Sequence, residues 1–196
     1  IGSLLGDLVE TIFCRITAGV WMSRSSLVWG PFSIIWGMAI VAATILLHKD
    51  REKPDRYLFM VGTFLGGAYE YLCSVFAELF FGKVFWDYSG IPFNLGGRIN
   101  LLYCFFWGIA AVIWIKVLYP RISDWIEKIP KLTGYIVTWC LILFMAANMV
   151  VSAAALVRYD QRAQGDTPDN AVEKLIDTRF DDARMEKIYP NAKSAR

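Results

Sequence analysis

The chain has 196 residues, of which 56% are hydrophobic and 15% aromatic, and its mean hydropathy is +0.42. A soluble domain of this length rarely carries so much apolar weight, so the composition indicates a membrane protein. The formal net charge is only +2, and the sequence has one histidine and no Walker, GxGxxG, GxSxG or HExxH motif. Its four cysteines lie singly within apolar segments. We therefore expect no metal site, no cofactor, no recognised nucleotide site and no nucleic-acid partner.

Five apolar segments follow one another along the chain, and we interpret each as a membrane-spanning helix. In chain order they are Ile1–Trp21, Phe32–Leu47, Tyr57–Phe81, Leu101–Tyr119 and Gly134–Val157. The last is the clearest because it contains no charged residue, whereas the first contains Asp7, Glu10 and Arg15. The predicted fold class is all-α, a polytopic membrane protein with about five transmembrane helices.

Small and acidic residues recur at every fourth position in two of these segments. The longer series is Gly62, Gly66, Glu70, Ser74, Glu78 and Gly82, and the shorter is Gly2, Gly6, Glu10 and Cys14. On a helix, this spacing draws one stripe along a single face. In each case a polar turn with an arginine and then a Trp-Gly pair follow. We interpret these as two repeated hairpin units, 1–48 and 57–119. The alternative is that small residues recur only because they let membrane helices approach closely.

The last part of the chain differs from the rest in composition. We assign 1–157 to a transmembrane domain, with 134–157 as its fifth helix, and 158–196 to a charged C-terminal tail. Thr167-Pro168 predicts a helix start, and an apolar stripe follows it. The stripe consists of Val172, Leu175, Ile176, Phe180 and Ala183. This pattern predicts one short amphipathic helix packed on the transmembrane domain or on the membrane surface, and a solvated tail is the alternative.

Basic residues predict the orientation of the chain in the membrane. The loop KDREKPDR contains four basic residues in eight positions, and further basic residues flank ISDWIEKIP (residues 122–130), which we interpret as a short interfacial helix. The positive-inside rule places both regions in the cytoplasm and the sequence WDYSGIPFNLGGR (Trp86–Arg98, the 86–98 hairpin) outside.

Glu10 and Glu70 lie near the centres of their predicted spans. An ionised carboxylate at that depth costs roughly 2.5–3.5 kcal/mol on insertion scales, so it is retained with a partner or for a function. One interpretation is a structural lock with Arg15, Arg24 or Arg98. The other is a polar cavity that binds a cation, a polar solute or a lipid headgroup.

The 86–98 hairpin and the residues next to it carry more polar groups than an ordinary interfacial loop needs. Arg98 follows two glycines, and we expect it to pair with Asp87, Glu70 or Glu78. We assign no catalytic residue. The candidate substrate-binding or cavity residues are Glu10, Arg24, Glu70, Glu78, Trp86, Asp87, Tyr88, Asn94, Arg98 and Asn100.

These motifs resemble those of a bacterial family of integral membrane proteins, the family called "Putative ABC-transporter type IV". The resemblance rests on Gly6-xxx-Glu10, on Arg24 with GPFSIIWG, and on Glu70 with WDYSGIPFNLGGRINL. Ser25 departs from the family pattern, in which a glycine usually follows the arginine, and Asn100 stands where a cysteine is common. The resemblance implies a multi-pass protein of the bacterial inner membrane with a permease-like role.

Three classes of function are consistent with these features. The first is a transporter or permease-like subunit that binds a small polar or lipid-like solute in a cavity lined by Glu10, Glu70 and the 86–98 hairpin. Its partners would be membrane lipids and either a separate ATPase subunit, docked near Trp125, or a second copy of the chain. The second is an intramembrane enzyme that acts on a lipid-linked or phosphate-containing substrate through Glu70, Asp87 and Arg98. We favour a transporter over an enzyme because no nucleophile–base pair is recognisable. The third is a structural or assembly factor.

Overall fold

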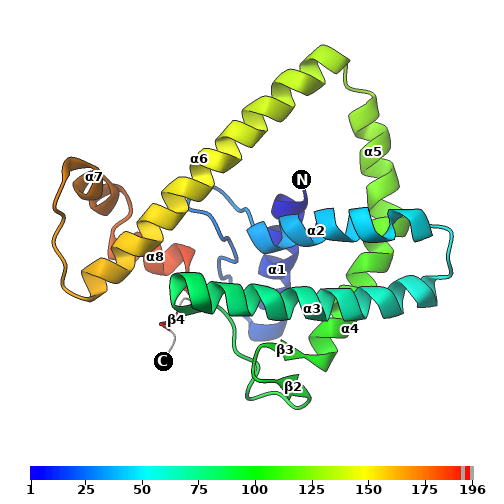
Figure 1. Cartoon of the computed structure of the whole chain (residues 1–196), viewed down its shortest axis with the longest axis horizontal. Coiled ribbons are helices and arrows are strands. Elements are labelled where there is room, and N and C mark those ends of the chain that lie inside the picture. Colours follow the sequence, from blue (N-terminus) through cyan, green and yellow to red (C-terminus); the bar gives the residue numbers. More distant parts are fainter. Residues whose placement is uncertain (191–192, 195–196) are drawn as a thin grey trace. The chain divides into compact units, whose positions relative to one another are not determined.

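The computed structural model describes residues 1–190 and 193–194, and it is predominantly helical, as the sequence predicts (Figure 1). The α-helices are α1 (Gly2–Ala18), α2 (Ile34–Leu47), α3 (Asp55–Phe81), α4 (Leu101–Ile113), α5 (Tyr119–Glu127), α6 (Lys131–Ala163), α7 (Ala171–Arg179) and α8 (Asp182–Ile188). A 3-10 turn (His48–Asp50) follows α2, and a π-helical turn (Trp114–Leu118) joins α4 to α5. The short strands β1 (Lys83–Val84) and β4 (Lys193–Ser194) pair with each other, as do β2 (Asn94–Leu95) and β3 (Ile99–Asn100), and both pairs are antiparallel.

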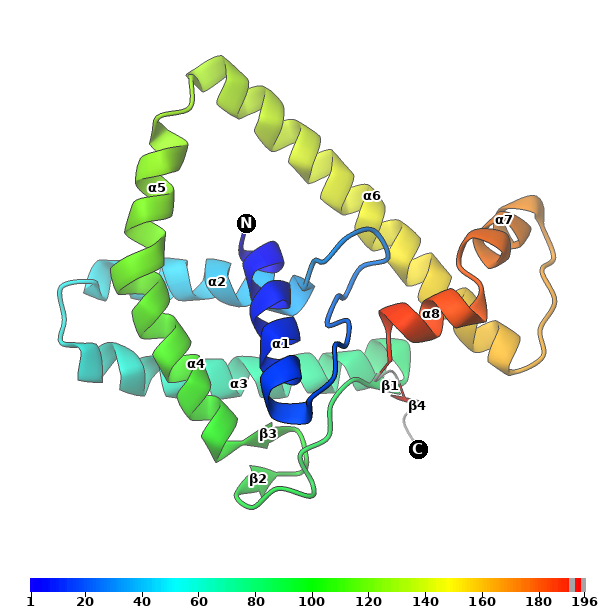
Figure 2. The same cartoon turned by 180° about the vertical axis from the view of Figure 1, so that it is seen from behind.

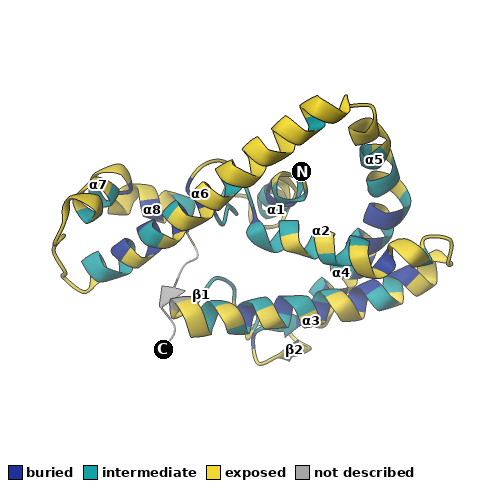
Figure 3. Ribbon diagram, turned by 45° about the horizontal axis from the view of Figure 1, so that its top comes forward, coloured by how far each residue is buried: buried dark blue, intermediate teal, exposed yellow. Residues whose placement is uncertain are grey.

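Three of the described helical segments are long and apolar enough to cross a membrane. They are Asp55–Phe80, Leu101–Glu127 and Lys131–Ala163. The first two predicted spans form shorter helices, with 17 residues in α1 and 14 in α2. Most of α6 is exposed along its length (Figure 3), although its central part is apolar. Exposed apolar helices of this length are what a lipid bilayer stabilises.

The helix α4 continues into α5 without the break that the sequence predicts before residue 122. Pro120 has no amide hydrogen, and its ring would clash with the carbonyl one turn earlier in a regular α-helix. The turn from Trp114 to Leu118 is a wider π-helical turn, and the Tyr119 amide bonds to the Trp114 carbonyl. A π-turn accommodates the proline and lets the helix continue. The predicted separate interfacial helix is therefore wrong in its boundary, because α5 extends the fourth helix.

Contacts within the chain define two compact units, which we describe separately. Unit 1 contains Ile1–Gly37 and Leu132–Pro190, and unit 2 contains Met38–Lys131 together with β4. The boundary falls within α2, after Gly37.

In unit 2, α3 and α4 pack closely because small residues line the contact. Gly62 faces Gly108 and Ala111, Gly66 lies against the Trp107 side chain, and Gly67 lies against Cys104. Close approach of this kind is the main packing device of membrane helices. A further apolar cluster formed by Leu47, Leu58, Ala111, Trp114 and Ile115 extends the core beyond these glycines.

Gly108→Ala is expected to destabilise unit 2. A Cβ at Gly108 would overlap Thr63 Oγ1 and lie only 2.7 Å from the Phe59 carbonyl oxygen, which belongs to the backbone and cannot rotate away. Overpacking of this kind costs about 1–3 kcal/mol, which we expect to appear as a lower thermal unfolding midpoint in detergent. Gly90→Ala is the matched control, because no atom lies within 4 Å of its Cβ position. Equal midpoints for the two variants would contradict the packing described here.

In unit 1, the connection between α1 and α2 is held by α6. Asn148 of α6 accepts a hydrogen bond from the Trp29 amide (3.1 Å) and donates one to its carbonyl (2.8 Å). Ser152, one turn later, accepts one from the Val28 amide (2.9 Å). Asn148 is fully buried, so these bonds satisfy polar groups that could not reach water. The two polar residues in the otherwise apolar α6 therefore fix the path of residues 27–29.

The tail forms two short helices, whereas the sequence predicts one. Asn170 and Asp181 cap α7 and α8, each by accepting a hydrogen bond from an amide of the first turn. Phe180 separates the helices and is buried, but Val172 and Leu175 of the predicted stripe are exposed. The single-helix prediction was wrong because it gave weight to the apolar spacing and none to the capping aspartate.

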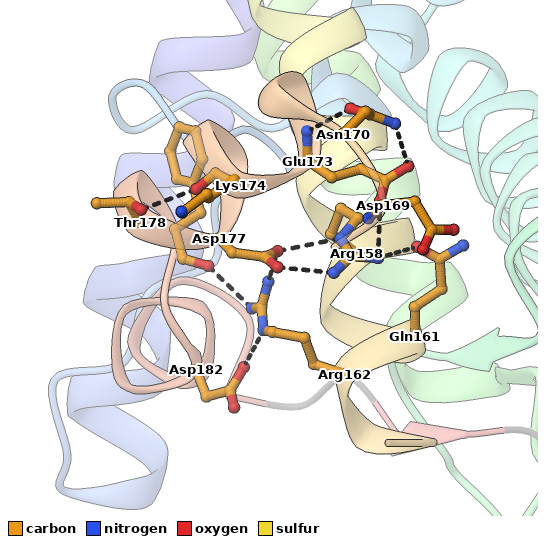
Figure 4. Close-up of polar contacts among 11 residues, drawn as sticks. Arg158, Gln161, Arg162, Asp169, Asn170, Glu173, Lys174, Asp177, Thr178 and Asp182 are labelled. Atoms are coloured by element: carbon orange, nitrogen blue, oxygen red, sulfur yellow. Dashed lines mark hydrogen bonds and ion pairs between the residues drawn. The ribbon is translucent and has the colours of Figure 1, made fainter. Parts of the chain in front are cut away.

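The tail is docked on the C-terminal end of α6, where α8 lies beside it (Figures 1 and 2). Arg158, with a side chain only 5% exposed, binds both carboxylate oxygens of Asp177 at 3.1 and 2.6 Å (Figure 4). Arg162 bonds to Asp177 at 2.5 Å and to Asp182 at 2.7 Å. The Tyr189 hydroxyl donates to the Ser26 carbonyl at 3.0 Å. Burial raises the pKa of Tyr189 to about 12, so this hydroxyl keeps its proton at neutral pH.

Asp177→Asn is expected to release the tail. The hydrogen bond from Arg158 holds the pKa of Asp177 below its usual value. The ionised form of Asp177 therefore stabilises the docked tail. That stabilisation is fully present above the unfolded pKa of about 3.9 and is lost as the pH falls through the lower folded value. At neutral pH we expect trypsin to cleave the tail of the variant several-fold faster than that of the wild type. Asp169→Asn, at an exposed position, is the control, and unchanged cleavage of Asp177→Asn would show that the ion pairs do not hold the tail.

Candidate functional site

The candidate site in unit 2 is a cluster of polar side chains along one face of α3. Glu70, Ser74 and Glu78 are spaced by four residues, so they lie one above another on the helix. The 86–98 hairpin and α4 supply the partners of these residues. We call this group the α3 cluster: Glu70, Ser74, Glu78, Tyr88, Arg98 and Trp107.

Glu70 is buried, with 6% of its surface exposed, in the middle of the α3 span. Its Oε1 accepts a hydrogen bond from the Tyr88 hydroxyl at 2.7 Å, and its Oε2 accepts one from Trp107 Nε1 at 2.9 Å. The Tyr88 ring stacks on Tyr103, with centroids 4.8 Å apart, which fixes the direction of its hydroxyl. Both carboxylate oxygens are therefore held by neutral donors from two other elements.

Arg98 lies at the other end of the cluster. Its Nη2 forms an ion pair with Glu78, and its Nη1 donates to Ser74 Oγ at 3.1 Å. The guanidinium lies 5.9 Å from the centre of the Tyr71 ring. The expectation that Arg98 pairs with a nearby carboxylate is confirmed, and the partner is Glu78.

The remaining polar residues of the hairpin bond to its own backbone. The Asp87 carboxylate accepts from the Ser89 amide at 2.8 Å, and the Asn94 side chain accepts from the Gly97 amide at 3.0 Å. The Trp86 indole donates to the Arg98 carbonyl at 2.9 Å. These bonds close the loop and set the position from which Arg98 reaches α3.

Asn100 connects the hairpin to α4. It is 1% exposed, its side chain caps the helix by accepting from the Leu102 amide at 2.9 Å, and it donates to the Pro92 carbonyl at 2.6 Å. Gly96 and Gly97 both have positive φ, which a glycine adopts without strain. The hairpin is thus held in place by Trp86, Asp87, Asn94 and Asn100. From it, Tyr88 contacts Glu70 and Arg98 contacts Glu78 of α3.

The other two predicted site residues meet in unit 1. Arg24 Nε donates to Glu10 Oε2 at 3.3 Å, and both side chains are partly exposed. Arg15, the other predicted partner, donates to the Gly19 carbonyl at the end of its own helix. In unit 1 the carboxylate is therefore locked by an arginine, as one of the two interpretations predicts.

Asp7 is a buried carboxylate that is not among the predicted site residues. It is only 3% exposed, and its Oδ1 accepts no hydrogen bond from the described residues. It lies three residues before Glu10, on a neighbouring position of α1 that the four-residue series of small and acidic residues does not include. Among the described residues, no group of His, Cys, Asp and Glu is arranged to hold a metal ion.

Comparison with known proteins identifies the family of the chain. The family model described as "Putative ABC-transporter type IV" matches residues 1–153, which include the whole α3 cluster and the Glu10–Arg24 pair. The chain belongs to this family. The match ends within α6, before the docked tail. With its apolar helices, the chain is thus a membrane protein of an ABC-transporter-related family. No curated protein and no solved structure matches the chain.

Proposed function

We propose that the chain is a permease-like membrane subunit that binds a small polar or lipid-like solute at the α3 cluster. The observation that carries the proposal is the buried Glu70 carboxylate, held on both oxygens by the hydroxyl of Tyr88 and the indole of Trp107. A carboxylate within a membrane-spanning helix is costly and marks a functional site by default. The family's description supports a role in transport.

The cluster is suited to bind a solute because its groups are positioned in advance. The hairpin is fixed by its own backbone bonds and by the Asn100 cap, so Tyr88 and Arg98 are presented to α3 by a rigid support. A hydroxyl or amino group of a solute can donate to a carboxylate such as that of Glu70, which accepts through both of its oxygens. Arg98 can in turn bind an anionic or carbonyl group of the solute.

We further propose that the chain spans the membrane five times and that its first four helices form two repeated hairpins. Equivalent close contacts in the two units support the repeat. Gly6 of α1 lies against Trp36 of α2, and Gly66 of α3 lies against Trp107 of α4. In the same helix pairs, Ser3 faces Gly37 and Thr63 faces Gly108. The repeat then gives each unit an acidic residue at an equivalent position, Glu10 in unit 1 and Glu70 in unit 2.

We also propose a membrane, an orientation and a partner for the subunit. It lies in the bacterial inner membrane among lipids, with the 86–98 hairpin outside and the basic loops inside. A separate ATPase subunit supplies the energy and docks near Trp125 of α5, a residue that is 70% exposed. An exposed tryptophan is a typical anchor of a protein interface.

Native mass spectrometry of the full chain in lipid nanodiscs tests the proposal. We expect the wild type to retain a non-protein, non-lipid adduct of constant mass, or one selected lipid species. Tyr88→Phe should retain several-fold less of it, because the variant removes one donor to Glu70 and keeps the ring that stacks on Tyr103. Tyr135→Phe removes a hydroxyl from an exposed position and is the control. If Tyr88→Phe and wild type retain the same adducts in the same amounts, the α3 cluster is not the solute site.

A further inference from the structure

Asp7 of unit 1 borders a groove between α1 and the connection to α2. The groove has a volume of about 410 Å³, which is within the range of small-molecule sites. Its polar lining includes Asp7, Thr11 and Ser25, and its apolar lining includes Leu8, Trp21 and Leu27. Buried polar atoms nearly always have a hydrogen-bond partner, so the Asp7 Oδ1 atom, which has none among the described residues, calls for a donor from outside the chain.

The charges around the groove favour a cation as this donor. Arg24 is bonded to Glu10, so it compensates one of the two carboxylates on this face of α1. The other charge belongs to Asp7. Arg15 lies eight residues further along α1, about 12 Å away at 1.5 Å per residue, and is engaged with Gly19 and the Trp21 ring. Asp7 and Glu10 together carry two negative charges and Arg24 one positive charge, so one negative charge remains beside the apolar lining of the groove.

We propose that this groove binds a small amphipathic ammonium compound. Its charged N–H group donates to Asp7 Oδ1, and its apolar part packs on Leu8, Leu27 and Trp21. The residues of this groove belong to unit 1, whereas those of the α3 cluster belong to unit 2. A test of ammonium binding in the groove is therefore independent of the test of solute binding at the α3 cluster.

Equilibrium dialysis of the full chain in nanodiscs at pH 8 tests the proposal, with radiolabelled phenethylammonium as the probe. We expect saturable binding of one molecule per chain. The neutral analogue 2-phenylethanol should compete at least tenfold less well, because it lacks the charge. Asp7→Asn should weaken binding by about tenfold to a hundredfold, the range for loss of one charged hydrogen bond. Asp124→Asn, at an exposed position of α5, should bind as the wild type does.

Leu8→Trp provides a second test that keeps the carboxylate. Leu8 is partly exposed, so a larger side chain there fills the groove at little cost to folding. We expect it to abolish binding, and this variant decides the question if Asp7→Asn does not fold. Absence of saturable binding by the wild type, equal competition by 2-phenylethanol, or full binding by Leu8→Trp would each overturn the proposal.

Discussion

Glu70→Gln is expected to abolish solute binding while leaving folded protein in the membrane. Glutamine has nearly the shape of glutamate, and its side-chain oxygen can still accept from Trp107 Nε1, which can only donate. Its amide group then faces the Tyr88 hydroxyl, which can turn and accept. The hydrogen bonds to Tyr88 and Trp107 are thus preserved, while the negative charge is lost. Retention of a solute, measured by native mass spectrometry, therefore reports the charge of Glu70.

Glu70→Leu separates the structural role of this side chain from its binding role. Leucine removes the acceptor of both donors, which costs about 1–3 kcal/mol for each buried group. We expect a clearly lower thermal midpoint for Glu70→Leu and a midpoint near the wild-type value for Glu70→Gln. Glu52→Gln, at an exposed position of the loop before α3, is the control and should change neither quantity.

The same substitution in unit 1 should have a smaller effect. Glu10 is paired with Arg24 and partly exposed, so we expect Glu10→Gln to break one ion pair of unit 1 and to reduce solute retention less than Glu70→Gln does. If Glu10→Gln and Glu70→Gln both fail to accumulate in the membrane, the two carboxylates are structural locks and the proposed solute site loses its main support.

The sequence predicts the long helices well because their apolar runs and their ends are local features. Pro54 precedes α3 and Gly82 follows it in the left-handed conformation, so the segment predicted at Tyr57–Phe81 is helical from Asp55 to Phe81. The α4–α5 junction was not predictable in this way. Pro120 usually ends a helix, and only the π-turn before it lets the helix continue.

The candidate site was predicted in its residues and only partly in its pairing. The spacing of Glu70 and Glu78 places both on one face of α3. The two glycines before Arg98 allow the backbone to turn so that the arginine side chain can contact this helix. Spacing along a helix does not reveal which of two carboxylates lies opposite a loop residue. That choice depends on the path of the 86–98 hairpin, which is set by its side-chain to backbone bonds.

Asp7 was missed for a different reason. It lines one groove with residues of the α1–α2 connection and with Ile188 of the tail, and neighbours so distant along the chain leave no local pattern in the sequence. The bonds of Asn148 and Ser152 to residues 28 and 29 hold that connection, and they cross more than a hundred positions of the chain.

Arg98→Lys is expected to keep the fold largely intact and to lose most solute binding. Arginine uses two nitrogens of its planar guanidinium, one for Glu78 and one for Ser74. A lysine ammonium keeps the charge but has a single nitrogen, so it cannot hold both partners in the same geometry. Arg98→Ala leaves the partly exposed Glu78 without its cation, and we expect it to cost about 1–3 kcal/mol, between the values for surface and buried pairs.

The exposed pair of Arg51 and Glu52 provides the matched control for both Arg98 substitutions. Arg51→Lys and Arg51→Ala should each shift the free energy of unfolding by less than about 0.5 kcal/mol, as exposed substitutions usually do. A double-mutant cycle of Arg98→Ala with Glu78→Gln then isolates the ion pair. A coupling energy near zero, or solute binding by Arg98→Lys at the wild-type level, would mean that Arg98 closes the hairpin without taking part in the site. A substantial coupling energy, together with loss of solute binding in Arg98→Lys, would support a direct role of Arg98. The solute would then require the several planar donors of the guanidinium and not its charge alone.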